Sequence, residues 1–267
     1  MCHAAPLGNL RREGEGGDAA AAIPGPSAAQ PRSGHVRCQK CTLAERGDKR
    51  VQNRSISTLL LWASALAGVS YLAVVVGSLS GPGIIVWKGA GVALLAVFAA
   101  LQARSVDGWL LAAVMALGAL GDVLLEIAFT AGAASFALGH VVAIALYRRN
   151  RRPALTGSQT ALAVVLALGT PLIAWLLTRA PDVTGYAVLL GLMATTAWMS
   201  RFPRYRTGIG AVLFVVSDLL IFARMGPLAG SALVGIAIWA FYYGGQLLIT
   251  LGVRRTLDED ASAGRHS

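Results

Sequence analysis

The chain has 267 residues, of which 55% are hydrophobic and 13% are charged, about half the charged share of a typical soluble domain. The 197 residues from Ser57 to Val253 carry only 16 charges, and a soluble fold of that size needs many more to stay dispersed. The composition therefore excludes a soluble enzyme, a nucleic-acid-binding domain and an intrinsically disordered chain. The net charge of +10 does not call for a nucleic-acid partner, because its positive residues flank apolar segments, where membrane topology explains them.

The first segment, residues 1–56, is rich in Gly, Ala, Pro, Ser and Arg and has no sustained apolar period. Such a composition predicts a disordered tail, on the cytoplasmic side. The tail holds His35, Cys38 and Cys41 in the spacing H-x2-C-x2-C. A zinc site needs four ligands, and nothing fixes the spacing of a fourth, so no metal site is predicted.

Beyond the tail, eight apolar runs follow one another with short breaks. A bilayer core of about 30 Å needs roughly 20 helical residues, and helices are the only choice because no alternating barrel pattern is present. The sequence predicts an all-α membrane domain of eight transmembrane helices over residues 57–253 and a short cytoplasmic tail over 254–267. The predicted spans are 57–79, 84–103, 109–129, 131–147, 161–177, 183–199, 208–223 and 229–253.

Arginine and lysine gather on alternate connections of these eight spans. Four arginines lie in the cluster at 148–152, three more lie in the connection at 201–206, and others flank both ends of the domain. We therefore expect a multi-pass protein of the plasma or inner membrane. The positive-inside rule predicts that both of its termini lie in the cytoplasm.

A short stretch of sequence in one span is similar to a stretch in another. Gly121-Asp122-Val123-Leu124-Leu125 resembles Ser217-Asp218-Leu219-Leu220-Ile221, at an offset of four helices. This similarity is compatible with two parallel four-helix halves, although chance similarity in apolar sequence also explains it.

Five ionisable residues lie within the predicted spans: Lys88, Asp122, Glu126, His140 and Asp218. Such groups cost several kcal/mol in a membrane unless paired or hydrated, so each is a candidate functional residue. Three of these residues also have purely structural explanations. The lysine can snorkel to the headgroups, the glutamate can be interfacial, and the histidine can bridge two helices. The two aspartates lie deepest, and for them we favour function over a structural ion pair or hydrogen bond.

The last span adds an aromatic and polar face. Trp239, Tyr243 and Gln246 share one side of the helix at spacings of four and three. Helix–helix packing explains this face, and so does the wall of a cavity that binds an amphiphile.

Three patches resemble the YhhN-type lysoplasmalogenases. Residues 118–147, GALGDVLLEIAFTAGAASFALGHVVAIALY, resemble the family's G-D-x-x-L … F-x-x-x-H … Y signature. Residues 211–225, AVLFVVSDLLIFARM, resemble its F-x-x-S-D signature, and residues 241–253, FYYGGQLLITLGV, resemble its closing Y-Y-x-x-Q-x-L-I. The patches occur in the expected order.

The resemblance implies an integral membrane hydrolase that cleaves the vinyl ether of lysoplasmalogens, releasing a fatty aldehyde and glycerophosphocholine or glycerophosphoethanolamine. It implies a lysophospholipid substrate and no cofactor. Such chemistry needs a proton donor and a carboxylate that activates water, the division of labour of paired carboxylates in glycosidases. Asp122 and Asp218 then take the catalytic roles, assisted by His140. Lys88 would meet the lipid phosphate as a point charge, and Glu126, Tyr243 and Gln246 complete the expected substrate-binding residues.

Two other function classes remain open at the level of sequence. A proton-coupled transporter or exporter of a small amphiphile would suit the buried acids, and Gly169-Thr170-Pro171 is a modest signal for the broken helix it needs. A non-catalytic membrane scaffold is also conceivable, but it does not account for the cost of the buried carboxyls.

Overall fold

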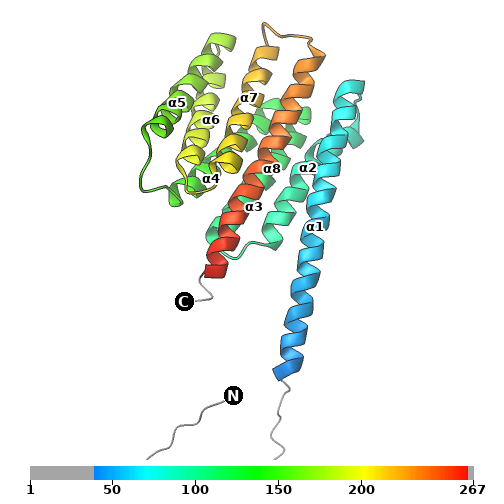
Figure 1. The fold of residues 1–267 in the computed structure, drawn as a ribbon. Coiled ribbons are helices and arrows are strands. Elements are labelled where there is room, and N and C mark those ends of the chain that lie inside the picture. The colour runs from blue at the N-terminus through cyan, green and yellow to red at the C-terminus, as the bar shows by residue number, and fades with distance from the viewer. Residues whose placement is uncertain (1–38, 264–267) are drawn as a thin grey trace, which may run out of the picture. The chain divides into compact units, whose positions relative to one another are not determined.

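The computed structural model describes the backbone of residues 39–263. The chain divides into Met1–Glu45, of which only residues 39–45 are described, as helix, and a second compact unit, Arg46–Ser267. The described residues form eight α-helices and one π-helical turn, shown in Figure 1. They are α1 (Gln39–Gly77), α2 (Pro82–Leu101), α3 (Val106–Ile127), α4 (Phe129–Arg149), α5 (Gly157–Thr178), α6 (Pro181–Met199), η1 (Arg204–Gly208), α7 (Ile209–Arg224) and α8 (Ala232–Ala263).

The prediction of an all-α polytopic membrane protein is confirmed. In the described part of the chain, seven segments are long and apolar enough to cross a membrane, and each overlaps one of the predicted runs. The helix α6 is not among them, because Asp182, three threonines and Tyr186 lower the mean hydropathy of its 19 residues.

The ends of the first and last helices differ from the prediction. Residues 39–56, predicted to be disordered, are helical and continue into the first apolar run, since extending an existing helix costs little compared with starting one. The predicted tail after Val253 is helical to Ala263, where Arg254–Asp258 and Arg255–Glu259 ion pairs join residues one turn apart. The disorder predicted for residues 1–38, with His35 and Cys38, lies outside the described residues.

Several pairs of helices that follow one another in the chain pack side by side. The pairs α2–α3, α3–α4, α5–α6 and α7–α8 are in contact, and α4 also contacts α6. The helix α8 joins the two sides of the bundle, because it contacts α2 and α3 as well as α7. Between α7 and α8 the backbones nearly touch: a Cβ atom added to Gly245 would lie 2.7 Å from the carbonyl oxygen of Gly210. Small residues at such crossings permit the close packing that holds membrane helices together.

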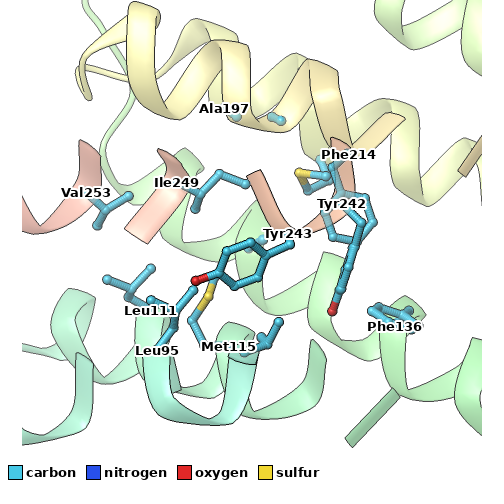
Figure 2. Packing of buried hydrophobic residues seen from close by; sticks show 14 of the residues in the cluster. Leu95, Leu111, Met115, Phe136, Ala197, Phe214, Tyr242, Tyr243, Ile249 and Val253 are labelled. Carbon is cyan, nitrogen blue, oxygen red and sulfur yellow. The ribbon is translucent and has the colours of Figure 1, made fainter. Parts of the chain in front are cut away.

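Large apolar and aromatic side chains fill the centre of the bundle. Figure 2 shows Leu95, Leu111 and Met115 facing Tyr243 and Ile249 of α8. Tyr242, the neighbour of Tyr243, points in another direction, where its ring makes edge contacts with Phe136 and Phe214. These two tyrosines therefore serve different parts of the molecule.

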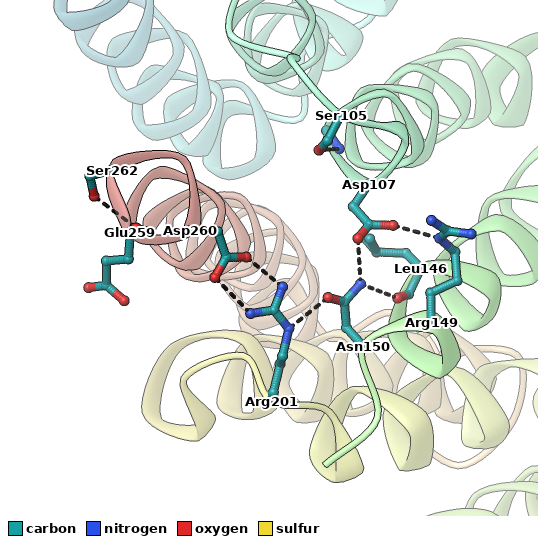
Figure 3. Close-up of polar contacts among 10 residues, drawn as sticks. Ser105, Asp107, Leu146, Arg149, Asn150, Arg201, Glu259, Asp260 and Ser262 are labelled. Carbon is teal, nitrogen blue, oxygen red and sulfur yellow. Dashed lines mark hydrogen bonds and ion pairs between the residues drawn. The ribbon is translucent and has the colours of Figure 1, made fainter. Parts of the chain in front are cut away.

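Polar residues fasten the end of the bundle at which α3 begins and α4 ends (Figure 3). Asp107 accepts hydrogen bonds from Arg149 at 2.7 Å and from the side-chain amide of Asn150 at 2.9 Å. Arg201 donates to Asn150 and, through both terminal nitrogens, to Asp260. The hydrogen bonds to Asp260 raise the pKa of the Arg201 guanidinium. This network ties the helical extension of α8 to α3 and α4.

Candidate active site

A cavity of about 440 Å³ opens among α2, α3, α4, α6, α7 and α8. Its volume lies within the range of typical ligand pockets, roughly 300–1,000 Å³. Most of its wall is apolar and comes from residues such as Leu125, Phe136, Leu189 and Ile238. The polar side chains on its wall are Lys88, Asp122, Thr130, Asp182, Tyr186, Ser217, Asp218 and Tyr242. An apolar chamber with a few polar groups on its wall is the usual form of a small-molecule site.

The carboxyl of Asp122 is one of the two deep acidic groups on the cavity wall. It belongs to the buried face of α3 and is 2% exposed. The hydroxyl of Tyr242 on α8 donates a hydrogen bond of 2.7 Å to its Oδ2. The edge contact between Tyr242 and Phe136 sets the tilt of the phenol ring. A tyrosine from one helix therefore positions the carboxyl of another.

The carboxyl of Asp218 is held in the same manner on the α7 wall. It is 6% exposed, and the hydroxyl of Tyr186 on α6 donates a hydrogen bond of 2.7 Å to its Oδ2. The next residue inward along this chain of bonds is His140, whose Nε2 lies 3.1 Å from the Tyr186 oxygen. A hydroxyl has one hydrogen to give. With that hydrogen on Asp218, the tyrosine oxygen accepts a hydrogen bond from the Nε2–H of a neutral His140.

A second, smaller cavity adjoins His140. Its volume is about 20 Å³, and it is lined by His140, Tyr147 and Gln246 together with apolar residues. A site needs roughly 10–15 Å³ of such volume and a few polar partners to hold one water molecule. Phe136 lines both cavities. His140 thus stands behind Tyr186, between a space of water size and the acidic group of the main cavity.

Lys88 and Glu126 form an ion pair near one end of the main cavity. The Nζ atom of Lys88 lies 2.5 Å from Oε1 of Glu126, and the two side chains are 17% and 43% exposed. Lys88 lines the cavity. The first turns of α4 and α6 contribute Phe129 and Asp182 to the same cavity. Because Glu126 follows Asp122 by four residues, the ion pair lies about 6 Å along α3 from the deep carboxyl.

The structure brings Asp122, Asp218 and Lys88 to one cavity, with Glu126 attached through its ion pair, and places Tyr243 and Gln246 elsewhere. The Tyr243 hydroxyl lies 2.9 Å from Ser64 of α1, which itself donates to the Gly91 carbonyl of α2. A Cβ at Gly68 would lie 2.4 Å from the Tyr243 ring, so the ring fills a notch in α1. Tyr243 thus fastens α1 and α2 to α8, while Gln246 lines only the small cavity.

Two tyrosines on this site were not selected from the sequence. Tyr186 and Tyr242 hold the two carboxyls, but tyrosine is common at helix ends in membrane proteins and does not by itself indicate function. The feature that could have indicated them is the need for a hydrogen-bond partner. A buried phenol needs an acceptor, and a buried carboxylate needs a donor. Sequence gives neither the rotation of α6 nor that of α8, so the pairs emerge only in three dimensions.

No group of three or more His, Cys, Asp and Glu side chains is placed to hold a metal ion within the described residues. What the site does offer is two buried carboxyls, each with a hydroxyl donor, in a largely apolar chamber with one ammonium group.

Comparisons with known proteins identify a family that covers the cavity. The YhhN family matches residues 83–253, which include every polar residue of the main cavity. The chain belongs to the YhhN family. Two curated relatives, both named lysoplasmalogenase, come from Mycobacterium bovis and Mycobacterium tuberculosis. Each is 34% identical over 157 residues, which cover 54% of this chain and 59% of the relative. The chain therefore spans less than two thirds of these relatives, and no solved structure matches it.

Proposed function

We propose that this YhhN protein is a membrane hydrolase that cleaves the vinyl ether bond of lysoplasmalogens. The observation that carries the proposal is the pair of buried carboxyls, Asp122 and Asp218, each hydrogen-bonded by a tyrosine on the wall of one apolar cavity. The 34% identity to two proteins named lysoplasmalogenase supports the same substrate class. A lysophospholipid is itself an amphiphile, which suits a largely apolar chamber with polar groups at one end.

The proposed reaction consumes one water molecule. A proton adds to the outer carbon of the vinyl ether, which leaves an oxocarbenium ion at the carbon bonded to oxygen. Water attacks that carbon and loses a proton, and the resulting hemiacetal collapses to a fatty aldehyde and the free hydroxyl of the glycerophospholipid. One group must donate a proton, and one carboxylate must activate water and stabilise the cation, as in glycosidases. Asp122 and Asp218 share these two roles.

Tyr242 and Tyr186 act as positioning residues in this scheme. Each fixes the rotamer of one carboxyl, and each hydroxyl can strengthen or weaken its hydrogen bond as the carboxyl changes charge. His140 supports Tyr186 from behind and connects Asp218 to the small cavity. This chain of hydrogen bonds provides a route by which a proton reaches Asp218 without passing the substrate.

The proposal includes a topology of eight spans with both termini in the cytoplasm of the cell membrane. The helix α6 packs on α4 and α5, both of which are long and apolar enough to span. Its polar residues Tyr186 and Asp182 face the cavity rather than lipid. A helix that turns its polar side to an internal cavity can span with a lower mean hydropathy. The arginine-rich connections at 148–152 and 201–206 then share the cytoplasmic side.

The proposal is tested by incubating the purified protein in detergent with 1-alkenyl lysophosphatidylcholine and its 1-acyl and 1-alkyl counterparts. Mass spectrometry then follows fatty aldehyde and glycerophosphocholine. We expect both products, in equal amounts, from the alkenyl lipid alone. Release of fatty acid from the acyl lipid would contradict the vinyl ether assignment. Movement of intact lysolipid across proteoliposomes without products would favour the transporter instead.

A further inference from the structure

The Lys88–Glu126 ion pair lies beside the main cavity, where it joins α2 to the last turns of α3, near the first turns of α4 and α6 that line the cavity. Lys88 lines the chamber and is only 17% exposed, whereas Glu126 is 43% exposed and is not part of the lining. The pair therefore presents a positive group to the interior and a negative group to the exterior. Asp182, at the start of α6, also lines the chamber, together with Asp122 and Asp218.

We propose that this ion pair is a recognition site for zwitterionic phospholipid headgroups, in which Lys88 binds the phosphate and Glu126 binds the ammonium of choline or ethanolamine. The inference rests on the proposed function and assigns two residues to the recognition of its substrate's headgroup. A zwitterionic headgroup carries its phosphate and its ammonium side by side, as the protein carries Lys88 and Glu126. Binding exchanges one ion pair for two, so neither protein charge is left buried without a partner.

The spacing along α3 places the reacting bond of such a lipid at the deep carboxyls. Glu126 and Asp122 are one helical turn apart, about 6 Å. In a lysoplasmalogen, the three-carbon glycerol backbone separates the phosphate from the vinyl ether oxygen, a span of the same order. Because Lys88 is paired with Glu126 and lines the same cavity as Asp122, a phosphate on Lys88 directs the glycerol backbone along the cavity toward Asp122. This registration supplies the positioning that the chemistry needs.

The arrangement also discriminates against anionic headgroups. A lipid whose headgroup ends in glycerol carries the phosphate but no ammonium. It takes Lys88 away from Glu126 and leaves the glutamate beside a phosphate, a like-charge contact that binding sites use to reject wrong ligands.

The test measures binding rather than turnover. Native mass spectrometry of the purified protein gives the Kd for 1-acyl lysophosphatidylcholine and 1-acyl lysophosphatidylglycerol of equal chain length. We expect wild type to bind the choline lipid at least about tenfold more tightly, since a like-charge contact costs several kcal/mol. In Glu126→Gln this preference should fall to about one, because the repulsion and the ammonium contact vanish together. Lys88→Gln should weaken both lipids by a similar factor.

Two further variants keep the outcome decisive. Glu259→Gln changes an exposed carboxylate of α8, far along the chain from the cavity lining, and should bind like wild type. The swap Lys88→Glu with Glu126→Lys retains an ion pair, so it should keep the thermal unfolding midpoint while losing the choline preference. A choline preference that persists in Glu126→Gln or in the swap would overturn the proposal. Neither ligand has a vinyl ether, so a failure of hydrolysis would count against the proposed function and leave this result standing.

Discussion

A carboxyl group inside a membrane costs several kcal/mol unless it is hydrogen-bonded or hydrated. Asp122 and Asp218 offset that cost in the same way, because each accepts a hydrogen bond from a tyrosine on a different helix. An asparagine could keep the hydrogen bond from the tyrosine but could neither exchange a proton nor carry negative charge. A carboxyl-to-amide change therefore separates a catalytic role from a structural one.

We predict that Asp122→Asn and Asp218→Asn each lower the kcat for aldehyde release by about 10²–10⁴-fold, the usual contribution of a general acid or base. The thermal unfolding midpoint in detergent should change little. Glu259→Gln, an exposed change of the same chemistry, should retain the wild-type rate. Wild-type turnover in either aspartate variant would remove that residue from the mechanism.

The hydrogen bond between Tyr186 and Asp218 yields a second prediction. Removing a hydrogen bond to a charged group costs about 1.5–3 kcal/mol, so Tyr186→Phe should lower kcat by about 10–100-fold. Because His140 acts through Tyr186, adding His140→Gln to Tyr186→Phe should cost much less than His140→Gln costs alone. Tyr205→Phe, at an exposed phenol, is the matched control. Additive effects of Tyr186→Phe and His140→Gln would show that the two residues act independently.

The aspartates were predictable from sequence and their tyrosines were not, for a physical reason. The free-energy cost of a buried charge depends on one residue and its depth in the membrane. Asp122 and Asp218 can therefore be recognised as candidates from the sequence alone. The roles of Tyr186 and Tyr242 depend on which helices face each other. The same limit explains Tyr243, which shares a face with Trp239 and Gln246 but packs against Gly68 of α1.

At the scale of helices, the α7–α8 crossing fixes how Asp218 faces the cavity. Gly245 and Gly210 lie at that crossing, while Gly244, one residue earlier, has open space where a Cβ would be. We predict that Gly245→Ala lowers the free energy of unfolding by about 1–3 kcal/mol, the usual cost of overpacking. Gly244→Ala should cause no loss, because the added methyl meets nothing and alanine favours helix. Denaturation in mixed micelles measures both variants, and equal effects would mean that the crossing is not close.

The positions of the helices could be predicted from the sequence, whereas the residues at which they begin and end could be predicted only in part. Hydropathy adds along the chain, so the apolar runs located all eight helices. Besides its own ion pairs one turn apart, the extension of α8 to Ala263 is held by hydrogen bonds from Arg201 to Asp260. No local pattern in the sequence predicts that contact between distant parts of the chain.

For the whole molecule, the proposed topology predicts which surface each connection reaches. In a variant without its three native cysteines, single cysteines at Ser80 and Arg179 should react with an impermeant maleimide on intact cells. Cysteines at Arg151 and Tyr205 should react only after the membrane is opened, because the arginine-rich connections stay in the cytoplasm. Arg179 and Tyr205 bracket α6, so labelling of both from the same side would mean that α6 does not span.

The neighbours of α8 are a feature of the whole molecule that sequence does not reveal. Its contacts with α2, α3 and α7 bring Tyr242 to Asp122 across the bundle. Order along the chain predicts contacts between successive helices, but a helix that closes the bundle meets partners far away in sequence.

The account is tested most directly by turnover of 1-alkenyl lysophosphatidylcholine in D2O, with mass spectrometry of the fatty aldehyde. Protonation at carbon predicts one deuterium on the carbon next to the carbonyl, in wild type, and a loss of labelled aldehyde in both Asp122→Asn and Asp218→Asn. Absence of aldehyde from the well-folded wild-type protein, or equal amounts of labelled aldehyde from wild type and both variants, would contradict carboxylate-driven cleavage.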